Sequence, residues 1–104
     1  MRTVWKYSIS MYREGVGTFF IPTGARLVHV APEVLNPGSL QEQAVSLWFE
    51  VDSTADKEPR VFEIFGTDHD IPESAGVYSG TAVMPPLVVH VYERTEPTEQ
   101  ERES

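Results

Sequence analysis

Two histidines on apolar stretches are the residues of this chain best placed for metal chemistry. His29 shares a predicted strand face with apolar Leu27, and His90 shares one with Val88 and Tyr92. If those strands paired, both imidazoles would project from one side of a sheet, where a nearby carboxylate could complete a metal site. The sequence lacks the close His-x-His pair followed by Glu that would make this site specific. We therefore expect no metal site, no cofactor, and histidines that are satisfied by the backbone or exposed.

The third histidine lies in Asp68-His69-Asp70, the most polar titratable cluster. Two carboxylates could orient the imidazole between them, as a catalytic dyad requires. Asp and His are also common in turns, and no Ser or Cys in a recognisable setting accompanies the cluster. We expect a structural turn here and predict no catalytic residue in the chain.

Trp48 points away from the main apolar face of its predicted strand, 44–52. The favoured explanation for this orientation is that both faces of the strand are buried, with Trp48 in the core. If Trp48 is instead exposed beside Ser46 and Glu50, it is a candidate contact for a ligand or partner. The candidate binding residues are Trp48, His29, His90, Asp68, His69 and Asp70.

Short stretches with a period of two position these side chains, and Pro, Gly, Asn and Asp separate them. We expect hairpins that join the first two strands and the fourth and fifth. The loop 32–43 is long, with a helical turn possible at 39–42. The predicted strands are 2–12, 18–21, 25–30, 44–52, 60–65, 77–83 and 87–94.

The fold class follows from strands with one apolar side and from the absence of a predicted long helix. Such strands must pack against another sheet or against a copy of themselves. We predict an all-β chain, a small antiparallel β-sandwich or barrel of about 6–7 strands. The domain should span 1–94, and 95–104 should form a flexible, disordered acidic tail.

Composition limits the partners. Eight basic and sixteen acidic residues give a formal charge of −8, which disfavours direct binding of nucleic acid. No stretch approaches the roughly 20 apolar residues of a membrane span, so we expect no membrane partner. The lack of cysteine fits a reducing cytoplasm. A 104-residue domain buries a limited fraction of its surface, so a homo-oligomer is expected.

Five segments carry a resemblance: 3–7, 22–30, 47–52, 65–72 and 89–93. On these the chain resembles a family of short uncharacterised proteins, common in bacteriophage genomes and their actinobacterial hosts and classed as a domain of unknown function. The resemblance implies a phage-encoded accessory protein acting in the host cell or on the virion. It also implies glycine at the position of Asp68 in most members, and a shorter link than 32–43.

The leading hypothesis is a non-enzymatic binding module that engages a host protein or a small molecule in the host cytoplasm, with a counter-defence role among the options. One alternative is a virion structural or decoration protein. The other is a small metal-dependent β-barrel enzyme that uses His29, His69 and His90.

Overall fold

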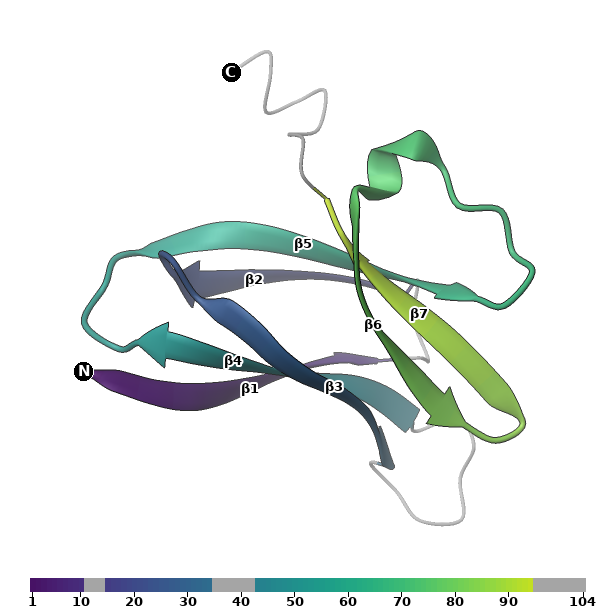
Figure 1. Ribbon diagram of the computed structural model, residues 1–104, viewed down its shortest axis with the longest axis horizontal. Helices are drawn as coiled ribbons and strands as arrows, with labels where there is room; N and C mark the ends of the chain where they lie inside the picture. Colours follow the sequence, from purple (N-terminus) through teal and green to yellow (C-terminus); the bar gives the residue numbers. More distant parts are fainter. Residues whose placement is uncertain (11–14, 35–42, 95–104) are drawn as a thin grey trace.

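The computed structural model describes residues 1–10, 15–34 and 43–94. This part of the chain forms strands and one short 3₁₀ turn, drawn in Figure 1. The all-β prediction is therefore confirmed. The elements are β1 (Arg2–Ser10), β2 (Val16–Pro22), β3 (Arg26–Val34), β4 (Gln43–Asp52), β5 (Lys57–Gly66), η2 (Glu73–Ala75), β6 (Val77–Met84) and β7 (Leu87–Glu93).

The strands form two antiparallel sheets whose apolar faces pack together. One sheet has the order β1-β4-β3 and the other the order β2-β5-β7-β6. Strand β3 also lies beside β6, and β1 lies near β2, so the edges of the two sheets approach each other. The result is a sandwich that is partly closed, like a flattened barrel.

Both predicted hairpins are wrong. Strand β1 pairs with β4, and β2 pairs with β5, so β1 and β2 belong to different sheets. The same holds for β4 and β5. Each of these strands has one apolar face, and moving the chain to the opposite sheet lets that face meet the core. Alternation in the sequence predicts which side chains point inward, but it does not predict the partner strand.

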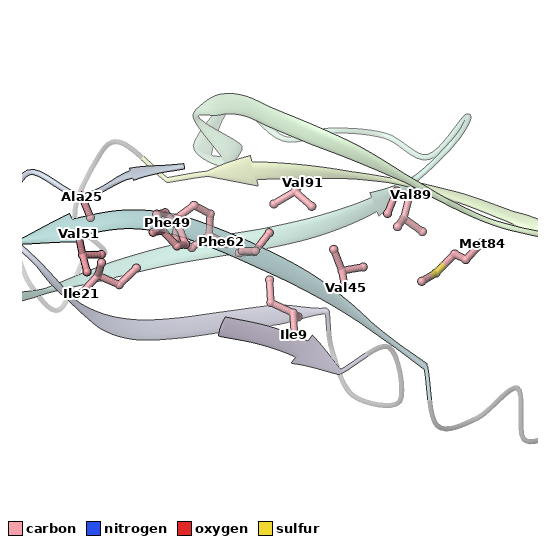
Figure 2. Packing of buried hydrophobic residues seen from close by; sticks show 12 residues of the cluster. Ile9, Ile21, Ala25, Val45, Phe49, Val51, Phe62, Met84, Val89 and Val91 are labelled. Carbon is pink, nitrogen blue, oxygen red and sulfur yellow. The ribbon is translucent and has the colours of Figure 1, made fainter. Parts of the chain in front are cut away.

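Most predicted inward faces are correct where the structure describes them, but the face predicted to be shared by Leu27 and His29 is wrong. Leu27 packs against the core while His29 lies opposite Trp48 on the outer face, because a bulge shifts the register between them. In β4, Val45, Leu47, Phe49 and Val51 are all buried, and Ile9 of β1 joins them. Figure 2 shows Val45, Phe49, Val51 and Ile9 meeting residues of the opposite sheet between the two layers. The predicted helical turn at 39–42 and the predicted tail 95–104 lie outside the described residues.

The third strand runs further than expected. The sequence predicts a stop at residue 30 because Pro32 opens the predicted loop, yet β3 continues to Val34. Strand β3 is an edge strand of its sheet, and an edge position tolerates proline because no neighbour there needs its N–H. This extension brings Glu33 onto the sheet.

A close approach between the sheets requires glycine at position 80. A Cβ atom there would lie 2.6 Å from Cγ2 of Val30 and 3.0 Å from its Cβ. Since real side chains essentially never come this close, Gly80 allows β6 to pass next to β3.

Arg60 of β5 lies at one end of the core. Its Nε and Nη2 donate to the Glu93 carboxylate at 2.6 and 2.8 Å, and its Nη1 donates to the carbonyl of Ala25 at 2.8 Å. The guanidinium carbon also lies 5.3 Å from the centre of the Phe49 ring and 5.7 Å from that of Phe62. One side chain thus contacts both sheets and the segment that precedes β3.

Substitution Arg60→Met should lower the free energy of unfolding by about 2 kcal/mol, because it leaves the partly buried Glu93 carboxylate without its cation. The measurement is urea denaturation. Arg26→Met is the control, since that exposed side chain lies 3.7 Å from Glu50 and should change stability by less than about 0.5 kcal/mol. Equal losses in the two variants would contradict the anchoring role of Arg60.

Candidate functional site

The histidines do not come together. His29 lies on the outer face of the three-stranded sheet, and His90 lies on the outer face of the four-stranded sheet. Their strands, β3 and β7, lie in different sheets and do not pair. The two imidazoles therefore do not project from one side of a sheet, as the metal-site hypothesis required. Across residues 1–10, 15–34 and 43–94, no group of three or more His, Cys, Asp or Glu side chains could hold a metal ion.

The Asp68-His69-Asp70 segment forms an exposed turn after β5. Its backbone closes through a hydrogen bond from the amide of His69 to the carbonyl of Gly66 at 3.2 Å. The His69 ring lies against Gly66, where a Cβ would be 3.1 Å from the ring. Asp68 has a φ of 70°, a left-handed conformation that favours glycine, which gives a physical reason for the glycine that the family resemblance implies there.

His90 is held in a row of hydroxyl groups. Its Nδ1 lies 3.0 Å from Oγ1 of Thr81 and its Nε2 lies 3.0 Å from Oγ1 of Thr67. The Tyr78 hydroxyl continues the row, 2.5 Å from Thr81 Oγ1. Both ring nitrogens are therefore occupied by neighbours, and His90 is a structural residue of this face.

Trp48 lies at the centre of the outer face of the three-stranded sheet. It is half-buried there and not in the core, so the favoured expectation of core burial is wrong. Its register partners are His29 on β3 and Lys6 on β1. The His29 and Trp48 rings stand 5.4 Å apart between centroids at 47°. The sequence identified both residues, and the structure brings them into contact.

One end of this face is fixed by Glu33. Its carboxylate accepts hydrogen bonds from Nζ of Lys6 at 2.7 Å and from the hydroxyls of Ser46 at 2.7 Å and Ser8 at 3.0 Å. The bond from Lys6, followed by those from the two serines, lowers the pKa of Glu33 to about 2. Sequence reasoning missed this group because it assigned Glu33 to a loop. The available signal was that Ala31 and Glu33 continue the strand's period of two on either side of Pro32, which indicates that the strand extends to Glu33.

The serines of this cluster do not form a nucleophile site. Both hydroxyls donate to a carboxylate that is already charged, and within the described ranges neither contacts an imidazole. Ser46 is also fully buried. The cluster holds β1, β4 and β3 together and keeps the Lys6 ammonium in place next to Trp48.

The other end of the face carries two arginines. Arg2 and Arg26 lie 3.8 and 3.7 Å from the same Glu50 carboxylate, and both side chains are largely exposed. A cavity of about 620 Å³ opens beside them, lined also by Thr23 and Gly24. Two guanidinium groups share one carboxylate, so donors remain available to a bound acidic group.

Asp52, at the same cavity, does not compete for these arginines. Its Oδ1 is 2.8 Å from the Met1 ammonium, and it accepts from the amide of Thr54 at 3.0 Å and its hydroxyl at 2.7 Å. The ammonium first, and then Thr54, hold the pKa of Asp52 well below its usual range.

We call the surface that bears Arg2, Lys6, Arg26, His29, Trp48, Glu33 and Glu50 the Trp48 face. Asp52 and the Met1 ammonium that pairs with it lie at the arginine end of the same face. With them the face carries four cationic groups (Arg2, Lys6, Arg26 and the ammonium) against three carboxylates. The rest of the described chain has three Arg and Lys residues against seven carboxylates. The Trp48 face is therefore a net positive strip on an acidic protein, with an aromatic pair between two charged ends.

Comparison with family models gives a match over residues 1–102 to a family described as a domain of unknown function (DUF7352). The chain belongs to this family. The family description assigns no activity, so membership does not choose between a binding and a catalytic role. Comparisons with curated proteins and with solved structures give no match. Among the residues described, no helix is long and apolar enough to span a membrane.

Glu33 predicts a specific pH dependence. Its folded-state pKa is lowered, so its stabilisation is fully present above its ordinary value of 4.5 and is lost as pH falls towards 2. The stability difference between the wild type and Glu33→Gln should therefore shrink between about pH 5 and 2. Thermal unfolding across this range measures the difference.

The control for this experiment is Glu73→Gln, since Glu73 is an exposed residue of η2. This variant should follow the wild type at every pH. A difference between wild type and Glu33→Gln that stays constant with pH would show that the Glu33 hydrogen bonds do not form in solution.

Proposed function

We propose that this chain is a non-enzymatic binding module and that its Trp48 face binds a partner protein. The observation that carries the proposal is the contact between the rings of Trp48 and His29 at the centre of a sheet face that no other described element covers. Trp is among the residues most enriched at energetic centres of protein interfaces, because it buries a large area and loses little rotamer entropy.

The charges at the two ends favour an acidic partner surface. Lys6 is held in place by Glu33, whereas Arg2 and Arg26 share the single carboxylate of Glu50 among the residues described. An aspartate or glutamate of the partner could enter the cavity beside the two arginines and form charge-assisted hydrogen bonds. Because the rest of the chain is strongly acidic, an acidic partner would be steered to this strip and repelled elsewhere.

The biological setting rests on the sequence resemblance. Short relatives common in bacteriophage genomes support a phage-encoded accessory protein that works in the cytoplasm of a bacterial host. The alternative of an enzyme built on His29, His69 and His90 has less support, because these side chains occupy two opposite faces and an exposed turn. Attachment to the virion is tested by searching for the chain in purified particles.

The test is capture from bacterial host lysate by the immobilised chain, followed by titration of the captured and purified protein. Substitution Trp48→Ala should weaken binding at least tenfold, about 1.4 kcal/mol, because it removes the aromatic centre of the face. Ile71→Ala is the control, since Ile71 is also an exposed apolar residue but lies in the β5–β6 connection. It should bind like the wild type.

Two results would contradict the proposal. One is a captured partner that binds Trp48→Ala and the wild type equally. The other is turnover of a small molecule that is lost on substitution of a histidine. If binding is lost in Arg2→Gln and Arg26→Gln as well, the acidic nature of the partner is supported.

A further inference from the structure

The outer edge of strand β1 is a row of backbone groups that no described element pairs. Within the residues that the structure describes, β1 is hydrogen-bonded to β4 alone and forms one side of its sheet (Figure 1). An edge strand of this kind leaves half of its N–H and C=O groups for a further strand to bind.

The register shows which residues of β1 present these groups. Facing residues of an antiparallel pair alternate between pairs that exchange both hydrogen bonds and pairs that exchange none. The amide of Ser53 donates to the carbonyl of Met1 at 2.8 Å, so these two residues form a bonded pair. The register continues from there without a shift, and every second residue after Met1 is bonded to β4. The N–H and C=O groups of Arg2, Val4 and Lys6 therefore point away from β4.

The other edge strands carry features that hinder pairing with a further strand. A bulge and a proline interrupt β3, a bulge interrupts β6, and β2 ends in Pro22. Proteins commonly protect their sheet edges with such interruptions. By contrast, β1 pairs with β4 over its nine residues without a shift in register and contains neither proline nor glycine. The regular edge of β1 is thus open to a further strand.

Lys6 does not block this edge. A lysine can protect an edge strand because an added strand would bury its charge. The Lys6 ammonium instead lies 2.7 Å from Glu33 of β3, on the far side of β4. Its side chain thus runs across the outer face of the sheet and away from the edge.

The charges of β1 indicate what kind of strand would fit. Arg2, Val4 and Lys6 have their side chains on the Trp48 face, and β1 contains no acidic residue. Of the other edge strands, β2 and β6 carry no charge, and β3 carries one arginine and one glutamate. On a chain with a formal charge of −8, β1 is the edge strand that attracts a segment with acidic side chains.

The accessible part of the edge is its N-terminal half. At the other end of β1, Ile9 lies close to β2, since a Cβ atom on Gly17 would be 3.0 Å from Cγ1 of Ile9. Nearer the N-terminus, the half-buried Trp5 ring packs against the core, and Nζ of Lys57 lies 5.5 Å from its centre. An apolar side chain of an added strand would pack beside this ring.

We propose that an extended segment of a partner protein binds to the edge of β1 as an additional antiparallel strand. Its main chain forms hydrogen bonds with Arg2, Val4 and Lys6. Its side chains on the Trp48 face are acidic where they lie opposite Arg2 and Lys6, and those on the core side are apolar beside Trp5. This inference rests on the proposed binding role of the chain and specifies how the partner's backbone is held.

The test is an NMR titration of the purified full-length chain with the synthetic peptide TEVTVET, whose ends are blocked. Its two glutamates are spaced to lie opposite Arg2 and Lys6, with a threonine opposite Val4. The peptide should slow hydrogen exchange of the Val4 and Lys6 amides, because its carbonyl groups accept from them. The control peptide has the same side chains but is N-methylated at both glutamates and the central threonine. Without these donors it should bind at least about tenfold more weakly.

Val4→Pro removes one donor of the edge from the chain itself. Since the N–H of Val4 takes no part in the pairing with β4, this edge position should tolerate proline. The variant should bind the peptide at least about tenfold more weakly than the wild type. Thr18→Pro is the matched control, because Thr18 is an exposed residue of β2 whose N–H points away from β5 by the same alternation. It should bind like the wild type, and circular dichroism checks that both variants keep their strands.

Three results would overturn the inference. They are unchanged exchange at Val4 and Lys6 with millimolar peptide, equal binding of the two peptides, and loss of binding in Thr18→Pro but not in Val4→Pro. If Val4→Pro does not fold, the comparison of the two peptides on the wild type decides.

The proposed function fails or stands separately. A captured partner that binds Val4→Pro like the wild type but loses affinity for Trp48→Ala uses the Trp48 face without the edge, which overturns only the inference. A partner that loses affinity for Val4→Pro but not for Trp48→Ala uses the edge alone, which contradicts the proposed role of the Trp48 face.

Discussion

The ion pair of Arg60 with Glu93 is the interaction on which the joining of the two sheets depends at one end of the core. Arg60 binds Glu93 within its own sheet, reaches the carbonyl of Ala25, and covers the Phe49 ring of the opposite sheet. A guanidinium suits this position because its fork satisfies a carboxylate and a carbonyl at once while its flat face lies on aromatic rings. At the other side of the sandwich, the close approach of Gly80 and Val30 has the same effect through packing alone.

The sequence was sufficient for the fold class and for the inward faces of most strands, because burial on one side imposes a period of two. It failed in β3, where a bulge breaks that period between Leu27 and His29. It was not sufficient for pairing. Nothing local in β1 distinguishes β4 from β2 as a partner, and the choice depends on how all the apolar faces meet. The end of β3 was predicted too early for a related reason. A proline such as Pro32 ends a central strand but is tolerated in an edge strand. That β3 is an edge strand is known only from the topology.

The candidate site was predicted in part. Trp48 and His29 were identified separately, Trp48 because it points away from the main apolar face of its strand and His29 because it is a titratable side chain within an apolar strand. Their contact could not be predicted without the β3–β4 register, which contains a bulge between Leu27 and His29. The hydrogen bonds of Glu33 depend on side chains from three strands, and such convergence has no local signature. The two outer faces consequently differ in kind, one with exposed charge and one with internal hydrogen bonds.

The crossing of the chain between sheets has a consequence for biosynthesis. Strand β1 has its hydrogen-bonded partner in β4, and β2 has its partner in β5, so neither can pair until a much later part of the chain has left the ribosome. Non-local pairing of this kind makes folding slow and delays it until β4 and β5 have been synthesised. During that interval the apolar sides of the early strands are open to chaperones and to other nascent copies.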